Sequence, residues 1–397
     1  MPHNGVDDEN RAASWEATRA DVISQLRMCL SDDLQAATAV VTNVEGSAYR
    51  RPGARLVVTG DSMLGAITAG CLEGPVAERA REVIESSTPS RQTYDLTDDE
   101  DDSWGMGLGC NGVIDLLVDP VDKSLRPALD ALAQHNPAVV LTVLEVDAGA
   151  ERAPVAPGDR TTVLADDSVA DSDSLEGTGR EPLPADFLDE VPKAIDADSI
   201  SEISSARTVE VPYNGTTVQV FCDPQEPIPT LLLFGSQGDV RPVSRYGRNA
   251  GFRVLVVTNR GAKADSSNFP AANTVRSVRA PDLAEAVDDP EHTYAVLMSH
   301  NFLDDRFGLE SLLDTEIPYI GLMGPRKRFE EMKSAFETEG KDLSQEEMNR
   351  IATPIGLDLG GDEPTQIALS IVAEVLAAKN GRAGGRLSSS DGPIHTR

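Results

Sequence analysis

Short apolar runs separated by stretches of helix length dominate the C-terminal part of the chain. The runs are rich in Val, Leu and Ile, as is typical of strands buried on both faces of a sheet. They cover residues 230–235, 253–259, 294–300 and 318–324. Strands that alternate with helices predict a parallel α/β sheet of the Rossmann type, and a last helix with apolar 3.6-residue periodicity is expected to begin near Pro364.

The N-terminal part predicts a second α/β domain that contains a diverged internal repeat. Three pairs of segments align at offsets of about one hundred residues: 39–44 with 138–143, 52–55 with 157–160, and 113–120 with 217–224. They are an apolar strand, a Pro-Gly turn and a strand that ends in Asp-Pro. The hypothesis is two copies of one unit, and the alternative is chance similarity between short β-rich segments.

Composition indicates where the domains end. Residues 1–12 are polar and residues 381–397 are rich in Gly, Ser and Arg, so both predict disordered tails. The Pro-punctuated segment 225–229 has the composition of a linker. The predicted domains are therefore residues 13–224 and residues 230–380.

The charge balance excludes some partners. With 66 acidic against 35 basic residues the formal net charge is −31, which disfavours nucleic acid and anionic membrane surfaces as partners. Only seven of the basic residues are Lys. An acidic, Lys-poor surface indicates adaptation to high salt, and an ordinary acidic cytosolic protein is the alternative.

The chain shows no sign of a secreted or membrane-bound protein. Its first ten residues are acidic and polar, whereas a signal peptide is basic and then apolar, and no run approaches the ~18 apolar residues of a membrane span. Four cysteines are too few for a disulfide framework and form no CxxC pair. We therefore expect a cytoplasmic protein.

Three glycine-rich loops in the first copy are candidates for a binding rim. They cover residues 46–55, 69–74 and 104–112, and the second copy has no comparable glycine density. Glycines allow a backbone to approach a ligand closely. Cys71 and Cys110 lie in these loops, and thiolates suit soft metal centres. The alternative is three tight turns with inert cysteines.

Basic residues beside glycines suggest an anionic ligand that carries phosphate. Arg50, Arg51 and Arg55 lie close to Gly46 and Ser47. In the second domain, residues 326–328 place three cations at the start of a helix, where the helix dipole also favours an anion. Solvated basic faces are the alternative.

Further candidates follow the strands of the predicted Rossmann sheet, where such sheets bind ligands. They are Gly235 and Gly238, Asn259 and Arg260, His300, and Gly324 with Arg326. The first loop departs from the GxGxxG fingerprint. Asn259 stands where an NAD enzyme has an acidic residue, and Arg260 suits a phosphate better. A hydrogen-bonded structural role is the alternative for His300.

Taken in order, six segments resemble the XdhC/CoxI family across nearly the whole chain. They are residues 46–74, 107–112, 231–240, 295–305, 318–328 and 352–375. The resemblance implies an XdhC/CoxI-type N-terminal domain and a Rossmann-like C-terminal domain.

The resemblance also implies a maturation chaperone rather than a turnover enzyme. Such a protein binds molybdenum cofactor (molybdopterin), protects it during sulfuration and helps insert it into a xanthine-dehydrogenase or CO-dehydrogenase-type hydroxylase. The hydroxylase is the implied partner, a cysteine desulfurase is a further candidate, and self-association stays open. The alternative from the residues is an NAD(P)-dependent oxidoreductase that uses the Rossmann half.

The motifs assign cofactor contacts residue by residue. In the first domain these are Gly46, Ser47, Arg50, Arg55, Gly70, Cys71, Glu73, Gly109 and Cys110, with Cys71 and Cys110 nearest the metal. In the second domain they are Gly235, Gly238, Asn259, Arg260, His300, Gly324 and Arg326. Both cysteine turns lack one family glycine, at Ala69 and Asn111, and the first Rossmann turn lacks the family His. We therefore expect altered nucleotide recognition in the second domain.

Overall fold

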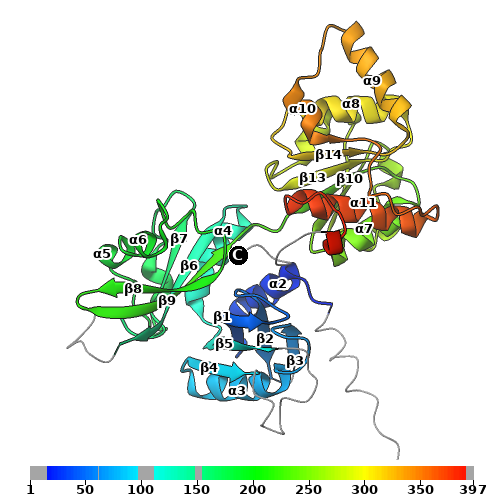
Figure 1. Ribbon diagram of the computed structural model, residues 1–397. Coiled ribbons are helices and arrows are strands. Elements are labelled where there is room, and N and C mark those ends of the chain that lie inside the picture. The colour runs from blue at the N-terminus through cyan, green and yellow to red at the C-terminus, as the bar shows by residue number, and fades with distance from the viewer. Residues whose placement is uncertain (1–15, 61, 97–110, 148–153, 390–397) are drawn as a thin grey trace, which may run out of the picture. The chain divides into compact units, whose positions relative to one another are not determined.

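The computed structural model divides the chain into two compact units, Met1–Pro227 and Ile228–Arg397 (Figure 1). The structure describes residues 16–60, 62–96, 111–147 and 154–389. The division falls inside the Pro-rich segment 225–229. Each unit is an α/β structure, as the sequence predicts.

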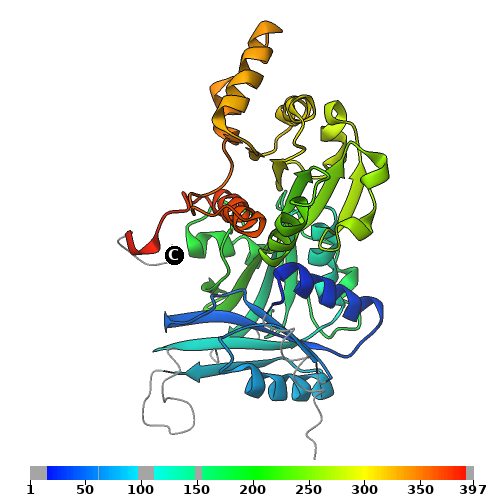
Figure 2. The same ribbon diagram turned by 90° about the vertical axis from the view of Figure 1, so that its right-hand side faces the viewer.

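The first copy of the repeat forms an antiparallel sheet of five strands in the order β3-β2-β1-β5-β4. Its elements are α2 (Arg19–Ser31), β1 (Ala37–Ser47), β2 (Arg55–Thr59), β3 (Ser62–Gly65), α3 (Glu73–Ser86), β4 (Ser90–Asp95) and β5 (Asn111–Pro120). Figure 2 shows α3 along one face of this sheet and α2 on the other. The apolar face under α3 forms a core that includes Val41, Leu56 and Leu116.

The second copy forms an antiparallel sheet of four strands in the order β7-β6-β9-β8. Its elements are η1 (Lys123–Leu125), α4 (Arg126–Ala133), β6 (Ala138–Val146), β7 (Arg160–Leu164), η2 (Ser172–Leu175), α5 (Ala185–Leu188), α6 (Val191–Ile195), β8 (Arg207–Tyr213) and β9 (Thr216–Gln225). Two short helices, α5 and α6, therefore replace the long α3 of the first copy.

The two sheets confirm the internal repeat. The order β2-β1-β5-β4 corresponds to β7-β6-β9-β8, and both long strand pairs are interrupted by a register shift, after Val41 and after Val143. Gly53 N donates to Val41 O, and Gly158 N donates to Val143 O. Val41 therefore corresponds to Val143, so the sequence alignment of the first strands is wrong by three residues. Periodic apolar strands tolerate such a slip, whereas the Pro-Gly turns fix the register.

Exchanged ion pairs join the two copies. Arg55 of the first copy binds Asp223 of the second, while Arg160 of the second binds Asp119 of the first at 2.5 Å. The arginines occupy corresponding turns and the aspartates precede corresponding prolines. Between the sheets, an apolar cluster contains Val40, Leu117, Leu144 and Phe221. We call residues 19–120 the first copy and residues 123–225 the second copy.

The second unit is a parallel sheet of six strands in the order β12-β11-β10-β13-β14-β15. Its elements are β10 (Thr230–Phe234), α7 (Val240–Asn249), β11 (Arg253–Thr258), η3 (Gly261–Lys263), η4 (Ser266–Asn268), β12 (Thr274–Ser277), η5 (Ala280–Ala286), β13 (Thr293–Leu297), α8 (Phe302–Leu313), β14 (Tyr319–Leu322), α9 (Arg326–Thr338), α10 (Gln345–Arg350), β15 (Ile351–Ala352), α11 (Pro364–Lys379) and η6 (Leu387–Ser389). Numbered within this unit the order is 3-2-1-4-5-6, the Rossmann arrangement.

Helices cover both faces of the parallel sheet. One apolar core lies under α8 and α9 and the other under α7 and α11. The four strands predicted from apolar runs are present, and β12 and β15 are additional. These edge strands are short and only partly buried, so they lack the apolar run that identifies the others. Within the described residues, no helix is long and apolar enough to cross a membrane.

Candidate functional site

The loop between β3 and α3 carries Cys71 and is held by its own polar groups. The Glu73 carboxylate is buried and accepts hydrogen bonds from the amides of Ile67, at 3.1 Å, and Thr68, at 2.8 Å. The Thr68 hydroxyl oxygen accepts from the amides of Gly70 and Leu72. Glu73, a predicted cofactor contact, therefore shapes the loop with its carboxylate.

Cys71 is the accessible one among the three described cysteines. Cys29 and Cys222 are buried, whereas Cys71 is half-buried and packs against the core beneath the loop. Gly70 has a φ of 112°, which a residue with a side chain rarely adopts. The loop leads directly into α3, whose first turn favours a negatively charged group. Gly109 and Cys110 lie outside the described residues.

The strands β1 and β5 bring two of the predicted loops together. Gly46 pairs with Gly112 and Ser47 with Asn111, the residue that follows Cys110 in the chain. The contact is close, because a Cβ on Gly112 would lie 2.4 Å from the carbonyl oxygen of Glu45. Gly46 and Ser47 therefore lie beside the start of β5.

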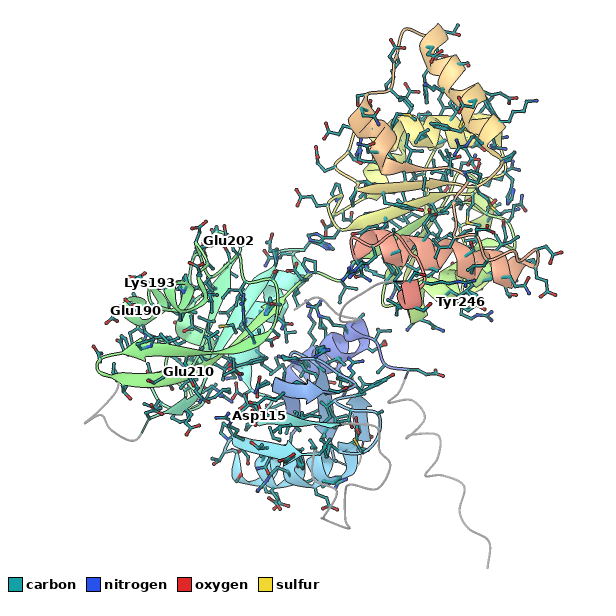
Figure 3. The ribbon with its side chains drawn as sticks, in the orientation of Figure 1. Asp115, Glu190, Lys193, Glu202, Glu210 and Tyr246 are labelled. Carbon is teal, nitrogen blue, oxygen red and sulfur yellow. The ribbon has the colours of Figure 1, made fainter. Side chains whose placement is uncertain are left out.

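Asp115 ties β1, β5 and β4 together near this end of the sheet (Figure 3). Its carboxylate accepts a hydrogen bond from the Thr93 hydroxyl at 2.6 Å and from the Asn43 amide nitrogen at 3.2 Å. The sequence analysis missed this residue, because its role depends on a strand pairing that only the fold reveals.

The predicted arginines of the first copy separate into two kinds. Arg50 and Arg51 are exposed, whereas Arg55 is largely buried and bound to Asp223. Burial raises the pKa of Asp223, and the positive charges of Arg55 and Arg19 oppose that increase. Arg55 therefore stabilises the join between the copies as well as lining the cavity described next.

A cavity of about 350 Å³ opens beside the Arg55–Asp223 pair. The elements α2, η1 and α4 supply apolar wall residues, among them Ile23, Leu26, Leu125, Leu129 and Leu132. The charged part of the wall consists of Arg19, Arg50, Arg55 and Asp223. Such a volume and such a mixture of surfaces are typical of small-molecule sites.

No cluster of three or more His, Cys, Asp or Glu side chains is positioned to hold a metal ion within the described ranges. The Cys71 thiol is one donor of the kind that soft metal centres accept.

In the second unit, the candidates lie at the carboxyl ends of β10, β11, β13 and β14. Gly235 must be glycine, since a Cβ there would lie 2.7 Å from the carbonyl oxygen of Met298. Asn259 is half-buried and Arg260 is exposed. The structure brings the loops after β10 and β13 together at the point where the strand order reverses, which is the ligand crevice of this fold.

His300 bridges this crevice. Its Nε2 lies 2.6 Å from Oδ2 of Asp239, which follows β10, and its backbone φ is 59°. His300 is thus hydrogen-bonded, and the partner, Asp239, was not among the predicted site residues. Only the parallel pairing of β10 with β13 places the two side chains within reach.

A second cavity, of about 240 Å³, lies beside the turn after β10. Ser236, Gln237 and Gly238 line it together with Arg241 and Lys263. Lys263 reaches the carbonyl oxygen of Ser236 at 3.5 Å. The sequence analysis missed both cations, which come from separate segments. Arg241 alone carried a signal, because it begins the helix that follows the predicted turn.

The basic segment 326–328 does not act as one patch. Arg326 and Lys327 are exposed at the start of α9, whereas Arg328 binds the buried Asp305 at 2.5 Å. Gly324 has a φ of 124°, and a Cβ there would lie 3.1 Å from Cδ of Arg328. Arg326 and Lys327 are therefore the two exposed cations of the segment, and Nζ of Lys327 lies 3.8 Å from Oε1 of Glu331.

Comparisons with known proteins give concordant matches. The model of the XdhC and CoxI family matches residues 29–95, and that of the XdhC Rossmann domain matches residues 231–375. A probable xanthine dehydrogenase subunit of Bacillus subtilis (strain 168) is 25% identical over 359 residues, which is 90% of this chain and 97% of that protein. The "Uncharacterized protein YqeB" of Escherichia coli (strain K12) is 25% identical over 180 residues, which is 45% of this chain and 32% of that protein.

A solved structure shares the fold. The crystal structure of a xanthine dehydrogenase from Bacillus halodurans aligns with a TM-score of 0.69 at 24% identity, covering 93% of this chain and 97% of that one. The two-unit architecture therefore has an experimental counterpart along almost its full length.

Proposed function

Because the chain belongs to the XdhC/CoxI family, we propose that it binds molybdenum cofactor, assists its sulfuration and inserts it into a molybdenum hydroxylase. The family and the relative named as a xanthine dehydrogenase subunit support a role in xanthine dehydrogenase maturation. The cofactor would be cargo, and the client enzyme would be the partner. Transfer to a client requires binding that is both specific and reversible.

The observation that carries the proposal is the loop of Cys71. The loop fixes a half-buried thiol at the start of a helix, while the other two described cysteines are buried. The cargo supplies the metal and its sulfur chemistry. Cys71, with Cys110 as the predicted second thiol, would hold the metal end. The Glu73 carboxylate already accepts hydrogen bonds from loop amides, so its role there is to shape the loop.

Cofactor retention tests the proposal directly. The protein is produced in cells that make the cofactor, and bound pterin is measured after oxidation to its fluorescent form. Cys71→Ser and Cys110→Ser should each lower retention by about tenfold or more, in line with losses at disturbed metal sites. Cys29→Ala is the matched control, because Cys29 is buried in α2 of the same copy. Equal retention by all four proteins would refute the role of the loop.

A second candidate function rests on the cavity beside the turn after β10. Arg241 and Lys263 flank Gly238 there, which suits a phosphate group, and the strand order is that of dinucleotide-binding sheets. An NAD(P)-dependent oxidoreductase would bind NADP through these cations. Titration with NADP and with pterin separates the two functions. Tight NADP binding with turnover, and no pterin binding, would replace the carrier hypothesis.

A further inference from the structure

One buried site, occupied by Arg180, distinguishes the two halves of the first unit. In the second copy, the Arg180 guanidinium donates hydrogen bonds to the carbonyl oxygen of Gly158 at 2.6 Å, to Asp119 Oδ1 at 2.7 Å and to Asp122 Oδ2 at 2.8 Å. Asp119 also binds Arg160 through its other oxygen. Asp223 is the carboxylate that corresponds to Asp119. It binds Arg55, at the turn of the first copy, through Oδ2.

Different segments lie beside the start of β7 and the start of β2. The counterpart of β3 in the second copy is the antiparallel return at Val169, and Arg180 comes from a later segment. In the second copy, Arg160 N donates to the carbonyl oxygen of Glu181, so Arg180 runs beside the start of β7. In the first copy the segment beside the start of β2 is Gly65-Ala66, since Gly65 pairs with Leu56. Both residues line the cavity of about 350 Å³. The segment beside the start of β7 thus supplies an arginine, whereas the segment beside the start of β2 supplies small residues that line a cavity.

The surroundings of the two corresponding glycines show the same difference. A Cβ on Gly158 would meet Nη1 of Arg180 at 3.4 Å and Pro89 at 3.5 Å. A Cβ on Gly53 would meet Ala206 at 3.1 Å and Oδ1 of Asp223 at 3.7 Å, and no other described atom within 4 Å. The Ala206 contact replaces that of Pro89, and no guanidinium atom of the described residues lies within 4 Å of the Gly53 position. Arg19 and a hydrogen bond from the Gln225 side chain also act on Asp223. Oδ1 of Asp223 faces that position.

A ligand that replaces the guanidinium must be a planar N–H donor, and charge limits the choice. The wall already carries Arg19, Arg50 and Arg55 against the single carboxylate of Asp223, so a second cation beside it would be repelled. A neutral ring offers N–H donors along one edge when its guanidine is part of the ring, as in a 2-amino-4-oxopyrimidine. One of these donors would reach Oδ1 of Asp223, because Arg55 binds Oδ2. The leucines of α2 and α4 suit the flat ring, and Arg19 and Arg50 suit an acidic substituent.

We propose that Asp223 recognises the 2-amino-4-oxopyrimidine edge of a pterin bound in this cavity. The proposal deepens the proposed function and rests on it, because the pterin would be the head of the molybdenum cofactor. Guanine carries the same edge, so the recognised chemistry is shared by two sources that an experiment must separate. Gly65-Ala66 precedes the loop of Cys71 in the chain.

Binding of matched pterins tests the recognition. The full chain is titrated with pterin-6-carboxylate and with lumazine-6-carboxylate, which has an oxo group in place of the 2-amino group, and fluorescence is followed. Loss of a hydrogen bond to a buried carboxylate should weaken the lumazine by at least about tenfold. Equal affinities for the two would overturn the role of Asp223. Guanosine and xanthosine monophosphates form the second matched pair.

Three variants complete the experiment. Asp223→Asn should abolish the preference for the 2-amino compound, whereas Glu210→Gln, an exposed carboxylate on β8, should leave it unchanged (Figure 3). Ala66→Arg should place a guanidinium in the cavity and abolish pterin binding in a folded protein, so it decides the matter if Asp223→Asn unfolds. Undiminished binding by Ala66→Arg would overturn the proposal.

The two proposals can fail separately. Selective binding of guanosine monophosphate without pterin binding would keep the role of Asp223 and refute the molybdenum cofactor as cargo. Retention of molybdenum cofactor by Asp223→Asn and by Ala66→Arg at the wild-type level would keep the proposed function and refute this site.

Discussion

The two copies of the repeat share a strand order and a pair of exchanged ion pairs. They differ at the turns, because side chains fill the site beside Asp119, whereas a cavity lies beside Asp223. At the turn of the second copy, two arginines and two aspartates neutralise each other around Asp119, which the first copy supplies. At the turn of the first copy, Asp223, which the second copy supplies, pairs with Arg55 and borders a cavity. One turn is thus closed by buried charge, while the other borders a cavity.

The largest expected effect comes from removing Arg180, whose side chain fills the buried site beside Asp119. Arg180→Ala removes three hydrogen bonds and leaves Asp119, which is 1% exposed, with too little positive charge. Removing one partner of a buried pair costs about 3 kcal/mol or more. Calorimetry should show a clearly lower melting temperature for the first unit, and a matched cavity should appear in a crystal structure.

Arg91→Ala is the control for this change. Arg91 also joins the two sheets, through Glu145 and Gln219, each at 2.7 Å, but the Arg91 and Glu145 side chains are 30% and 56% exposed. Such a pair contributes less than about 1 kcal/mol. If Arg180→Ala destabilised the protein no more than Arg91→Ala does, the network around Asp119 would not be the stabilising difference between the copies.

A second prediction concerns the pH dependence of stability, which should differ between Asp122 and Asp223. Burial alone would raise the pKa of Asp122, but Arg180, Ser124 and Arg160 outweigh it and hold that pKa below its usual range. Its contribution to stability is therefore present above the unfolded pKa and is lost as the pH falls through the folded one. The pKa of Asp223 is raised, so its carboxyl takes up a proton in the folded protein first, and acid favours folding at that site.

Melting temperatures between roughly pH 3 and pH 6, the range around a carboxyl pKa, check this contrast. Asp122→Asn should flatten the loss of stability in acid, and Asp223→Asn should steepen it. The same slope for both variants would mean that the two carboxylates experience equivalent surroundings, which would remove the electrostatic difference between the copies.

A third prediction concerns the thiols. In the folded protein, Cys71 should react with a disulfide reagent such as DTNB, because it is half-buried in a loop, and Cys110 is expected to react as well. Burial raises the pKa of Cys222 to about 12 and also raises that of Cys29, so both should react slowly. Mass spectrometry after short labelling identifies the modified residues. Labelling of Cys222 before Cys71 would contradict the assignment of the first copy as the binding copy.

The fold was largely predictable from the chain, because apolar runs of strand length and Pro-Gly turns are local signals. The Pro-Gly turns at Gly53 and Gly158 identified the repeat although the strands beside them were misaligned. Buried strands look alike when shifted by a few residues, and only pairing fixes them. The short edge strands β12 and β15 were not predicted, because they are only partly buried and lack an apolar run.

The site was less predictable, because its contacts join residues that are distant along the chain. Arg55 appeared to be one of three basic neighbours, but its partner, Asp223, is supplied by the other copy. Arg180 gave no signal at all, because it lies in a polar segment of the second copy. Its importance follows only from comparing two folded copies that the sequence merely suggests are related.

The smallest expected effect distinguishes the buried charges from those on the surface. The chain carries a net charge of −31, so repulsion between surface carboxylates should oppose folding at low salt. The Debye length falls from about 10 Å at 0.1 M to about 3 Å at 1 M salt, whereas buried pairs are screened much less. Molar KCl should therefore raise the melting temperatures of the wild type and of Arg180→Ala by the same few degrees. A flat response would show that the acidity is no adaptation to salt. A larger rise for Arg180→Ala would show that salt reaches Asp119 and that the second copy is less closed than its hydrogen bonds indicate.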